Sequence, residues 1–212
     1  MPCIREGIAI ILTVTVLAGC ATAPPAAVVT YAHKDCPASP DLSAAISLTP
    51  PKDKAVYSVT TRLDAMAPCL SRQDGASPYH VYALPEDAET KTVTVGSILE
   101  QTRLLPPQIS ILDREGKVRR SFSTADYFFR GTVYSVQFQP RAGDAYVLVA
   151  TDPARVGQEY NSISIGTSTS STYANGAAIS WTSGVDQRVS RIFSYEGSVE
   201  VTLYNNPTDK QR

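Results

Sequence analysis

Residues 145–151, Ala-Tyr-Val-Leu-Val-Ala-Thr, decide the fold of this 212-residue chain. The run from Tyr146 to Ala150 is apolar without interruption and rich in residues that favour strands. Strands that are buried on both faces have this near-continuous apolar pattern. The stretch therefore predicts a central strand with other parts of the protein packed on each of its sides.

In the surrounding segments, apolar residues recur at every second position. Val199, Val201 and Leu203 alternate with polar neighbours, and Val93 to Val95 and Ile109 to Ile111 show the same period. This period is typical of strands with one buried face and one solvated face. The expected strands are Val56–Leu63, Tyr79–Leu84, Thr92–Leu99, Gln108–Asp113, Val118–Phe122, Thr132–Gln139, Ala145–Thr151, Ser162–Gly166, Ala177–Trp181 and Ser198–Tyr204. We predict an all-β fold, an antiparallel β-sandwich of jelly-roll-like type.

Polar turns and two short helical turns complete the expected domain. Asp113–Lys117 and Pro140–Asp144 are turn sequences at the spacing expected between antiparallel neighbours. Leu42–Ile46 and Ala154–Gln158 each follow an aspartate that can cap a first helical turn. Neither helical turn is expected to form much of the core.

The N-terminus predicts export and lipid attachment. Arg5 precedes the apolar segment Ile8–Ala18, which is too short to span a bilayer and is typical of a signal peptide. Leu17 to Cys20 resemble the cleavage box of bacterial lipoproteins, in which the cysteine is acylated and becomes the first residue. Ala21 resembles the pattern of lipoproteins sent to the outer membrane. An ordinary secretory signal, cut elsewhere, is the alternative.

The mature chain divides into a tether, one domain and a tail. Residues 20–40 are rich in Ala, Pro, Thr and Ser, and their prolines oppose regular structure, so we expect a lipidated, flexible tether. Removing residues 1–19 from 212 leaves 193, which is enough for one domain with a sizeable core. We place the β-sandwich domain at residues 41–205 and a polar tail at 206–212.

Cys36 and Cys69 form the one even pair in the mature chain. Cys3 lies in the signal peptide and Cys20 takes the lipid, so in an oxidising compartment the other two are expected to form a disulfide. A loop of about 33 residues closed in this way is stabilised by roughly 3 to 4 kcal/mol. A metal site or a catalytic thiol is the alternative, but no histidine lies at ligand spacing from either cysteine.

The chain offers little for catalysis. His33 lies in the expected tether, and His80 lies in an expected strand, where we interpret it as structural. The acidic residues lie mostly at turns, and no serine, histidine and acid arrangement is recognisable. We predict no catalytic residue, no cofactor and no metal. A hydrolase built from carboxylates of two turns is the alternative, and it requires a pocket holding two carboxyl groups of raised pKa.

Composition also limits the partners. The chain is 43% hydrophobic and 18% charged, with a formal net charge of −1. It has no basic patch for nucleic acid, so we expect no nucleic-acid partner.

Three features are candidates for binding. Tyr127 and Phe128 precede Arg130, and aromatic rings beside an arginine suit stacking on sugars, although loop aromatics also anchor cores. Gly166–Thr172 is nearly all hydroxyl-bearing and is expected to be a solvated loop, with a partner-facing loop as the alternative. Trp181, the single tryptophan, is either a ligand platform or part of the core or sandwich edge. The candidate ligand-binding residues are therefore Tyr127, Phe128 and Trp181.

A family resemblance extends over roughly residues 41–204. It is carried by Tyr82–Pro85, Pro106–Asp113, Tyr127 and Phe128, Arg130–Val133, Phe138–Pro140, Tyr146–Val149 and Thr151, with a weaker match from Tyr173 to Leu203. In order and spacing these segments resemble the maltose operon periplasmic protein family. The resemblance implies a periplasmic accessory protein associated with maltose and maltodextrin uptake, without an enzymatic role. It carries over no catalytic residue.

These observations lead to two functional hypotheses. The first is a periplasmic lipoprotein, anchored to the outer membrane by lipid, with a non-catalytic accessory or binding role in maltose, maltodextrin or other carbohydrate transport. The second is a structural or interaction lipoprotein of an envelope assembly, which docks a protein partner by an exposed strand edge or by the Ser/Thr-rich loop. In both, the partners are the membrane and either an oligosaccharide or an envelope protein.

Overall fold

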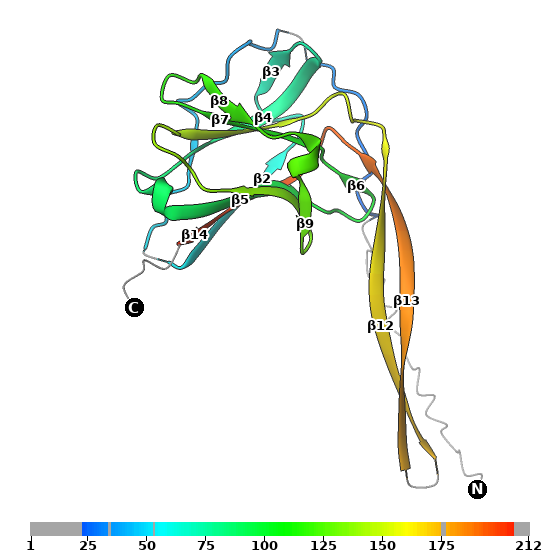
Figure 1. The fold of residues 1–212 in the computed structure, drawn as a ribbon. Helices are drawn as coiled ribbons and strands as arrows, with labels where there is room; N and C mark the ends of the chain where they lie inside the picture. The colour runs from blue at the N-terminus through cyan, green and yellow to red at the C-terminus, as the bar shows by residue number, and fades with distance from the viewer. Residues whose placement is uncertain (1–22, 34, 53, 175–176, 206–212) are drawn as a thin grey trace, which may run out of the picture.

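Two β-sheets face each other and a long two-stranded ribbon projects away from them (Figure 1). The computed structural model describes residues 23–33, 35–52, 54–174 and 177–205. The first sheet has the order β1-β4-β11-β7-β8, with β3 paired to β4, and the second has the order β2-β14-β5-β10-β9. The third sheet, β12-β13-β6, contains the ribbon.

The strands have the following bounds. The first sheet consists of β1 (Ile46–Ser47), β3 (Cys69–Arg72), β4 (Gly75–Ala83), β7 (Pro107–Leu112), β8 (Val118–Ser121) and β11 (Tyr146–Thr151). The second consists of β2 (Val56–Leu63), β5 (Lys91–Ile98), β9 (Phe128–Arg130), β10 (Val133–Phe138) and β14 (Gly197–Asn205). The third consists of β6 (Arg103–Leu104), β12 (Glu159–Ala174) and β13 (Ala177–Phe193). Neighbours are antiparallel except β1 with β4 and β13 with β6, which confirms the predicted all-β, mostly antiparallel fold.

β11 is the central strand that its sequence predicts. It lies between β4 and β7, and five of its six residues are buried. Val147 and Val149 join the main core between the two sheets, whereas Leu148 and Ala150 join a smaller apolar cluster on the other face. Its continuous apolar run is therefore explained by burial on both faces.

The alternating strands bury the expected faces. Val199, Val201 and Leu203 of β14 are at most 3% exposed, and so are Val93 and Val95 of β5. They pack against residues of β7 and β11 from the opposite sheet in a single core cluster. At about 0.8 kcal/mol per buried methylene, this shared core is the main stabilising contribution to the packing of the two sheets.

The predicted disulfide is present. Cys36 and Cys69 are bonded, with their Cα atoms 5.3 Å apart. The bond ties the segment that follows Cys36 to β3, and the N–H of Ser71 donates to the carbonyl of Pro37 at 2.8 Å. Leu42, further along that segment, packs on the smaller apolar cluster. The bond thus holds this segment over the outer face of the first sheet.

One of the two predicted hairpin turns joins different sheets. Asp113–Lys117 connects β7 to its antiparallel neighbour β8, and the N–H of Asp113 donates to the carbonyl of Lys117 at 3.0 Å. Pro140–Asp144 forms a turn, but it leads from β10 in the second sheet to β11 in the first. The expectation that Pro140–Asp144 joins paired strands was therefore wrong, because a turn sequence does not determine which sheet the next strand enters.

The predicted helical turns do not continue into helices. At Leu42–Ile46 and Ala154–Gln158 the chain forms hydrogen-bonded turns, with aspartate side chains accepting backbone N–H groups at 2.9 and 3.1 Å. The short helices of the described residues are instead the 3-10 turns η1 (Ala88–Thr90) and η2 (Thr124–Asp126). Among the described residues, no helix is long and apolar enough to cross a membrane.

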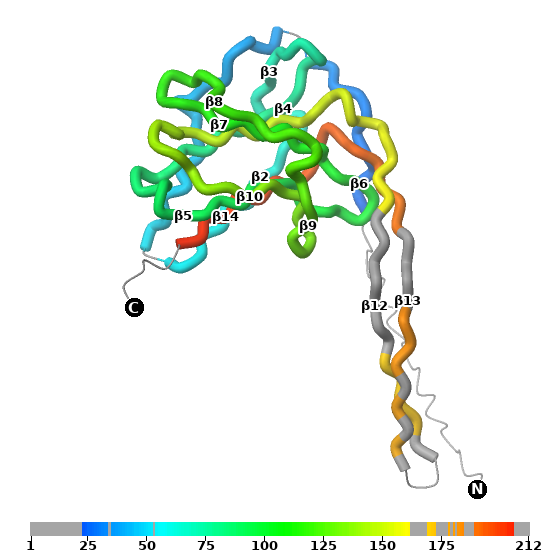
Figure 2. The backbone as a smooth tube through the Cα atoms, in the orientation of Figure 1, coloured from blue at the N-terminus to red at the C-terminus, as the bar shows by residue number. Residues whose placement is uncertain are grey.

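Part of the predicted tether lies against the domain. The N–H of Val28 donates to Ser194 Oγ at 2.9 Å, and the N–H of Tyr195 donates to the carbonyl of Val28 at 2.8 Å. Figure 2 shows this N-terminal segment, in blue, passing β6 near the start of the ribbon. The predicted signal peptide, Cys20 and the predicted tail at 206–212 lie outside the described residues.

Candidate functional site

The β12–β13 ribbon projects from the core: among its described residues, only Tyr160 and Phe193, at its base, belong to or pack against the core clusters. β12 has 16 residues, and its pairing with β13 runs without a break from Glu159 opposite Ile192 to Ala174 opposite Ala177. At about 3.4 Å per residue the ribbon is roughly 50 Å long. In Figure 1 it extends well beyond the two sheets. This finding corrects the prediction of a loop at Gly166–Thr172, because those residues lie within β12.

The ribbon is uncharged over most of its length. No residue from Tyr160 to Val185 carries a charged side chain, and eight residues between Tyr160 and Ala174 are serine or threonine. Thr169 and Thr182, which lie opposite each other, are exposed and join their hydroxyl groups at 3.0 Å. Exposed edge strands are usually protected from pairing by charges, prolines or bulges. Between Tyr160 and Ala174, β12 has no charged residue and no proline.

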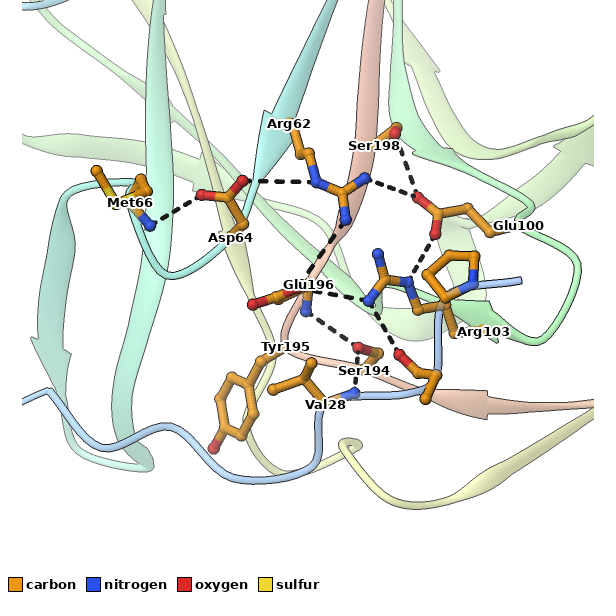
Figure 3. A network of polar contacts seen from close by, with 12 residues as sticks. Val28, Arg62, Asp64, Met66, Glu100, Arg103, Ser194, Tyr195, Glu196 and Ser198 are labelled. Atoms are coloured by element: carbon orange, nitrogen blue, oxygen red, sulfur yellow. Dashed lines mark hydrogen bonds and ion pairs between the residues drawn. The ribbon is translucent and has the colours of Figure 1, made fainter. Parts of the chain in front are cut away.

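A cluster of ion pairs fixes the base of the ribbon (Figure 3). Arg103 on β6 is 2% exposed, and its Nε donates to Glu100 Oε2 at 2.6 Å. Its Nη1 donates to Glu196 Oε2 at 3.5 Å and to the carbonyl of Ala26 at 3.0 Å. Arg191 of β13 donates from Nε to the carbonyl of Glu100 at 2.8 Å. The cluster therefore joins β6, β13 and the N-terminal segment.

The outer side of this cluster is solvated. The side chain of Arg62 is 48% exposed and lies 3.9 Å from Glu100 and 4.0 Å from Glu196. Each of these carboxylates therefore has two arginine partners. Because each carboxylate is paired with arginines, the arrangement suits a structural role, which holds these segments together, better than the role of a general acid and base.

Aromatic packing continues from the cluster to the N-terminal segment. Tyr31 stacks on Tyr195 with ring centroids 5.3 Å apart. Burial raises the pKa of Tyr31 to about 12. His33 stacks on Tyr31, so this histidine is part of the same contact.

A group of aromatic residues also packs at the base of the ribbon. Tyr160 of β12 packs near Phe129, Tyr134 and Phe193, with ring centroids 5.4 to 6.1 Å apart. The guanidinium of Arg155 lies 4.3 Å from the ring centroid of Phe193 and 5.6 Å from that of Tyr134. Cation–π contacts of this kind stabilise by about 0.5 to 2 kcal/mol each. The base of the ribbon is thus fixed to the domain by both polar and aromatic contacts.

The three candidate ligand-binding residues do not form one site. Tyr127 is 7% exposed, stacks on Tyr134, and accepts the N–H of Ile109 at 3.1 Å, so it is a core residue. Its pKa is raised by burial. Phe128, the next residue, is 61% exposed on the edge strand β9. Trp181 lies in β13 opposite Ser170, and its side chain lies outside the described part of the structure.

The polar groups singled out in the sequence have structural contacts. His80 Nε2 lies 3.0 Å from the carbonyl oxygen of Arg62, a contact between β4 and β2. Within residues 23–33, 35–52, 54–174 and 177–205, no group of three or more His, Cys, Asp or Glu is placed to hold a metal.

A polar groove that the sequence did not indicate lies beside the β10–β11 turn. Its volume is about 580 Å³, and its lining is Glu89, Arg120, Phe138, Gln139, Pro140 and Arg141. The Arg120 guanidinium lies 5.0 Å from the ring centroid of Phe138 and donates to Asp144 Oδ2 at 2.9 Å. Burial lowers the pKa of Arg120, while Asp144 opposes that shift.

The fold and the ribbon define a disulfide-bonded all-β protein with a projecting two-stranded arm. No protein-family model, no curated protein and no solved structure matches this chain.

Proposed function

We propose that this protein is a structural lipoprotein of the bacterial cell envelope, anchored to the outer membrane through Cys20, which docks a protein partner on its β12–β13 ribbon. The two-sheet body, a β-sandwich of jelly-roll-like type in this proposal, acts as the rigid support. The observation that carries the proposal is a long ribbon with a fixed base and no charged residue from Tyr160 to Val185. Strand addition to such an edge is an established way of binding a polypeptide.

The envelope location has two sources of support. A disulfide between Cys36 and Cys69 is the form expected in an oxidising compartment outside the cytoplasm. The apolar segment that ends at Cys20 supplies the export signal and the acylation site in this proposal. Three acyl chains on one residue anchor a protein stably, because stable binding requires more than one chain.

The anchor restricts how far the domain stands from the membrane. The described contacts with the body begin at Pro25, whose carbonyl accepts a hydrogen bond from Thr102 Oγ1. Five residues, 20–24, precede that contact and span at most about 18 Å when fully extended. In this proposal the ribbon base therefore lies close to the lipid surface.

The docking proposal is tested in cells. A photo-crosslinking amino acid replaces Thr169, which is exposed on β12, and in a matched strain it replaces Glu115, which is exposed in the β7–β8 turn. We expect a protein adduct from position 169 and none from position 115. The absence of an adduct at 169, or the same adducts at both positions, contradicts docking on the ribbon.

The anchor has its own test. Cys20→Ser is expected to remove acylation and to shift the protein from the membrane fraction to the soluble periplasmic fraction. Retention in the membrane fraction contradicts the anchor without affecting the docking test.

A carbohydrate-transport role is the second candidate function. The groove beside the β10–β11 turn presents Glu89, Arg120, Gln139 and Arg141, which are side chains with planar hydrogen-bonding groups. Such groups suit the hydroxyl groups of an oligosaccharide, and the resemblance to the maltose operon periplasmic protein family names maltodextrins as the first ligands to try. Calorimetric titration with maltodextrins should give heat that Arg141→Ala removes and Phe128→Ala leaves. No heat with any of several lengths contradicts this role.

A further inference from the structure

β12 differs from the other sheet edges of the described residues. It is the outer strand of the β12-β13-β6 sheet, and residues 160–174 of β12 carry no charge. The other outer strands are short or carry arginine: β1 and β6 have two residues each, β8 contains Arg119 and Arg120, β9 ends at Arg130, β2 contains Arg62 and β3 contains Arg72. β13 also has an outer edge, because within the described residues it pairs with β6 only at Ile192 and Phe193, but this strand carries Asp186, Arg188 and Arg191. Arginines oppose edge pairing, as charged edge residues commonly do.

Because its edge is uncharged from Tyr160 to Ala174, β12 can pair with β12 of a second copy of the chain without electrostatic repulsion. When the same edge pairs with itself in the antiparallel direction, a twofold axis relates the two strands and each residue meets a symmetry-related partner. Between Asn161 and Ala174 no like charges are brought together by such pairing. The single charged residue of β12, Glu159, lies at its first position, outside that stretch.

Self-pairing also gives the ribbon additional strands and hydrogen-bond partners for its outer edge. A two-stranded ribbon is marginally stable in water, and three or more strands are needed for independent stability. Two copies joined through β12 form a four-stranded sheet, β13-β12-β12-β13. The unpaired backbone groups on the outer side of each β12 gain hydrogen-bond partners in this sheet.

We infer that β12 docks a second copy of this chain, edge to edge and antiparallel, and that the protein is a dimer joined through its ribbons. This inference rests on the proposed docking function and names its partner. Fourteen residues, 161–174, give a contact about 48 Å long and about 10 Å thick, or roughly 1,000 Å² in total over both copies. That area is below the standard size of stable specific interfaces, so we expect a weak dimer that dissociates on dilution.

Sedimentation velocity of the purified protein in mild detergent tests the inference. We expect a monomer at low concentration and a dimer at high concentration. Thr169→Lys with Ser171→Lys places two charges on β12 and is expected to abolish the dimer.

The matched control is Ser180→Lys with Thr182→Lys. These residues lie directly opposite Ser171 and Thr169, are also exposed, and lie one strand further from the proposed contact. We expect this variant to dimerise with at most a few-fold weaker affinity, since both variants lose the Thr169–Thr182 hydrogen bond. Equal loss in both variants contradicts edge pairing, and a wild type that stays monomeric at all concentrations overturns the inference.

The two proposals fail separately. If the second copy is the partner, the adduct from position 169 in cells has twice the mass of the 22.8 kDa chain, apart from processing. A monomer in solution whose ribbon is crosslinked to a different envelope protein overturns the second-copy inference and supports the docking function. A ribbon that gives no adduct in cells overturns the docking function, even where the purified protein dimerises.

Discussion

The guanidinium of Arg103 lies 2.6 Å from the carboxylate of Glu100, and the arginine side chain is 2% exposed. A buried ion pair of this kind gains little over an apolar pair of the same shape, but removing one partner leaves a buried charge uncompensated. Arg103 also binds the carbonyl of Ala26. The pair therefore links the stability of the domain to the position of its N-terminal segment.

Arg103→Met is expected to lower the free energy of unfolding by about 3 kcal/mol. The variant keeps an apolar stem but leaves the solvated Arg62 as the remaining arginine partner of Glu100 and Glu196, while Ser198 still donates to Glu100. Equilibrium unfolding in urea measures the loss. Hydrogen exchange at Val28 is expected to become faster, because the segment that Arg103 holds is released.

Arg62→Met is the control, since Arg62 contacts the same two carboxylates from the solvated side at 3.9 and 4.0 Å. Exposed ion pairs contribute about 0 to 1 kcal/mol, so the loss should be below 1 kcal/mol. Equal losses in the two variants count against a buried clasp and in favour of a simple reduction of positive charge.

Cys36→Ser with Cys69→Ser is expected to lower the free energy of unfolding by about 3 to 4 kcal/mol, since the bond closes a loop with a sequence separation of 33. The segment after Cys36 should also exchange its amide hydrogens faster, because the bond ties it to β3. Unfolding in urea with and without reductant measures the difference. If reductant makes both thiols of the wild type fully reactive but leaves its free energy of unfolding unchanged, the disulfide does not have this stabilising role.

The body of the fold was predictable because its signals are local. Each expected strand overlaps an observed one, and the apolar run at Tyr146–Ala150 identified the central strand. The pairing across Pro140–Asp144 was not predictable in the same way. Which sheet a strand joins depends on contacts between segments distant in sequence. The residues of the turn do not determine those contacts.

The ribbon was predictable only in part. Ser162–Gly166 and Ala177–Trp181 were expected as strands, but the hydroxyl-rich residues between them have no apolar alternation that indicates a buried face. Asn175-Gly176 in the sequence is a signal that was available, because this dipeptide between two strand-like runs favours a two-residue hairpin. The ion pairs at the base were beyond local patterns, since Arg103 meets Ala26 and Glu196, which are distant in the chain.

Tyr82→Phe is expected to flatten the alkaline loss of stability. Tyr82 is fully buried and shares a hydrogen bond with Thr61, and its burial raises its pKa to about 12 from an ordinary value near 10. A group whose folded pKa is raised stabilises the fold below the unfolded pKa and loses this contribution as pH rises through the folded pKa. The loss therefore falls between pH 10 and about 12 and amounts to about 2 to 3 kcal/mol.

The variant is expected to lose about 1 kcal/mol at pH 8, for the missing hydrogen bond, and to decline less steeply above pH 10. Urea unfolding at pH 8, 10 and 11 measures both effects. Tyr127 is also buried and its pKa is raised in the same direction, so part of the decline should persist. A variant whose stability falls in parallel with the wild type from pH 10 to 11 rules out titration of Tyr82 as a cause.

Gly96→Ala is expected to be among the most damaging small substitutions in the second sheet. Gly96 lies in β5 between Ser135 of β10 and Glu200 of β14, and an added Cβ would lie 2.2 Å from the carbonyl oxygen of Tyr134. It would also lie 2.5 Å from Ser135 Cβ, so the backbone of β10 must move. Overpacking of this kind costs about 3 kcal/mol.

Gly184→Ala in the ribbon is the control, since no atom lies within 4 Å of its added Cβ, and its effect should stay within about 0.5 kcal/mol. Urea unfolding under the same conditions should show a lower free energy of unfolding for Gly96→Ala than for Gly184→Ala. Equal values would show that β5 and β10 can move apart without loss of stability.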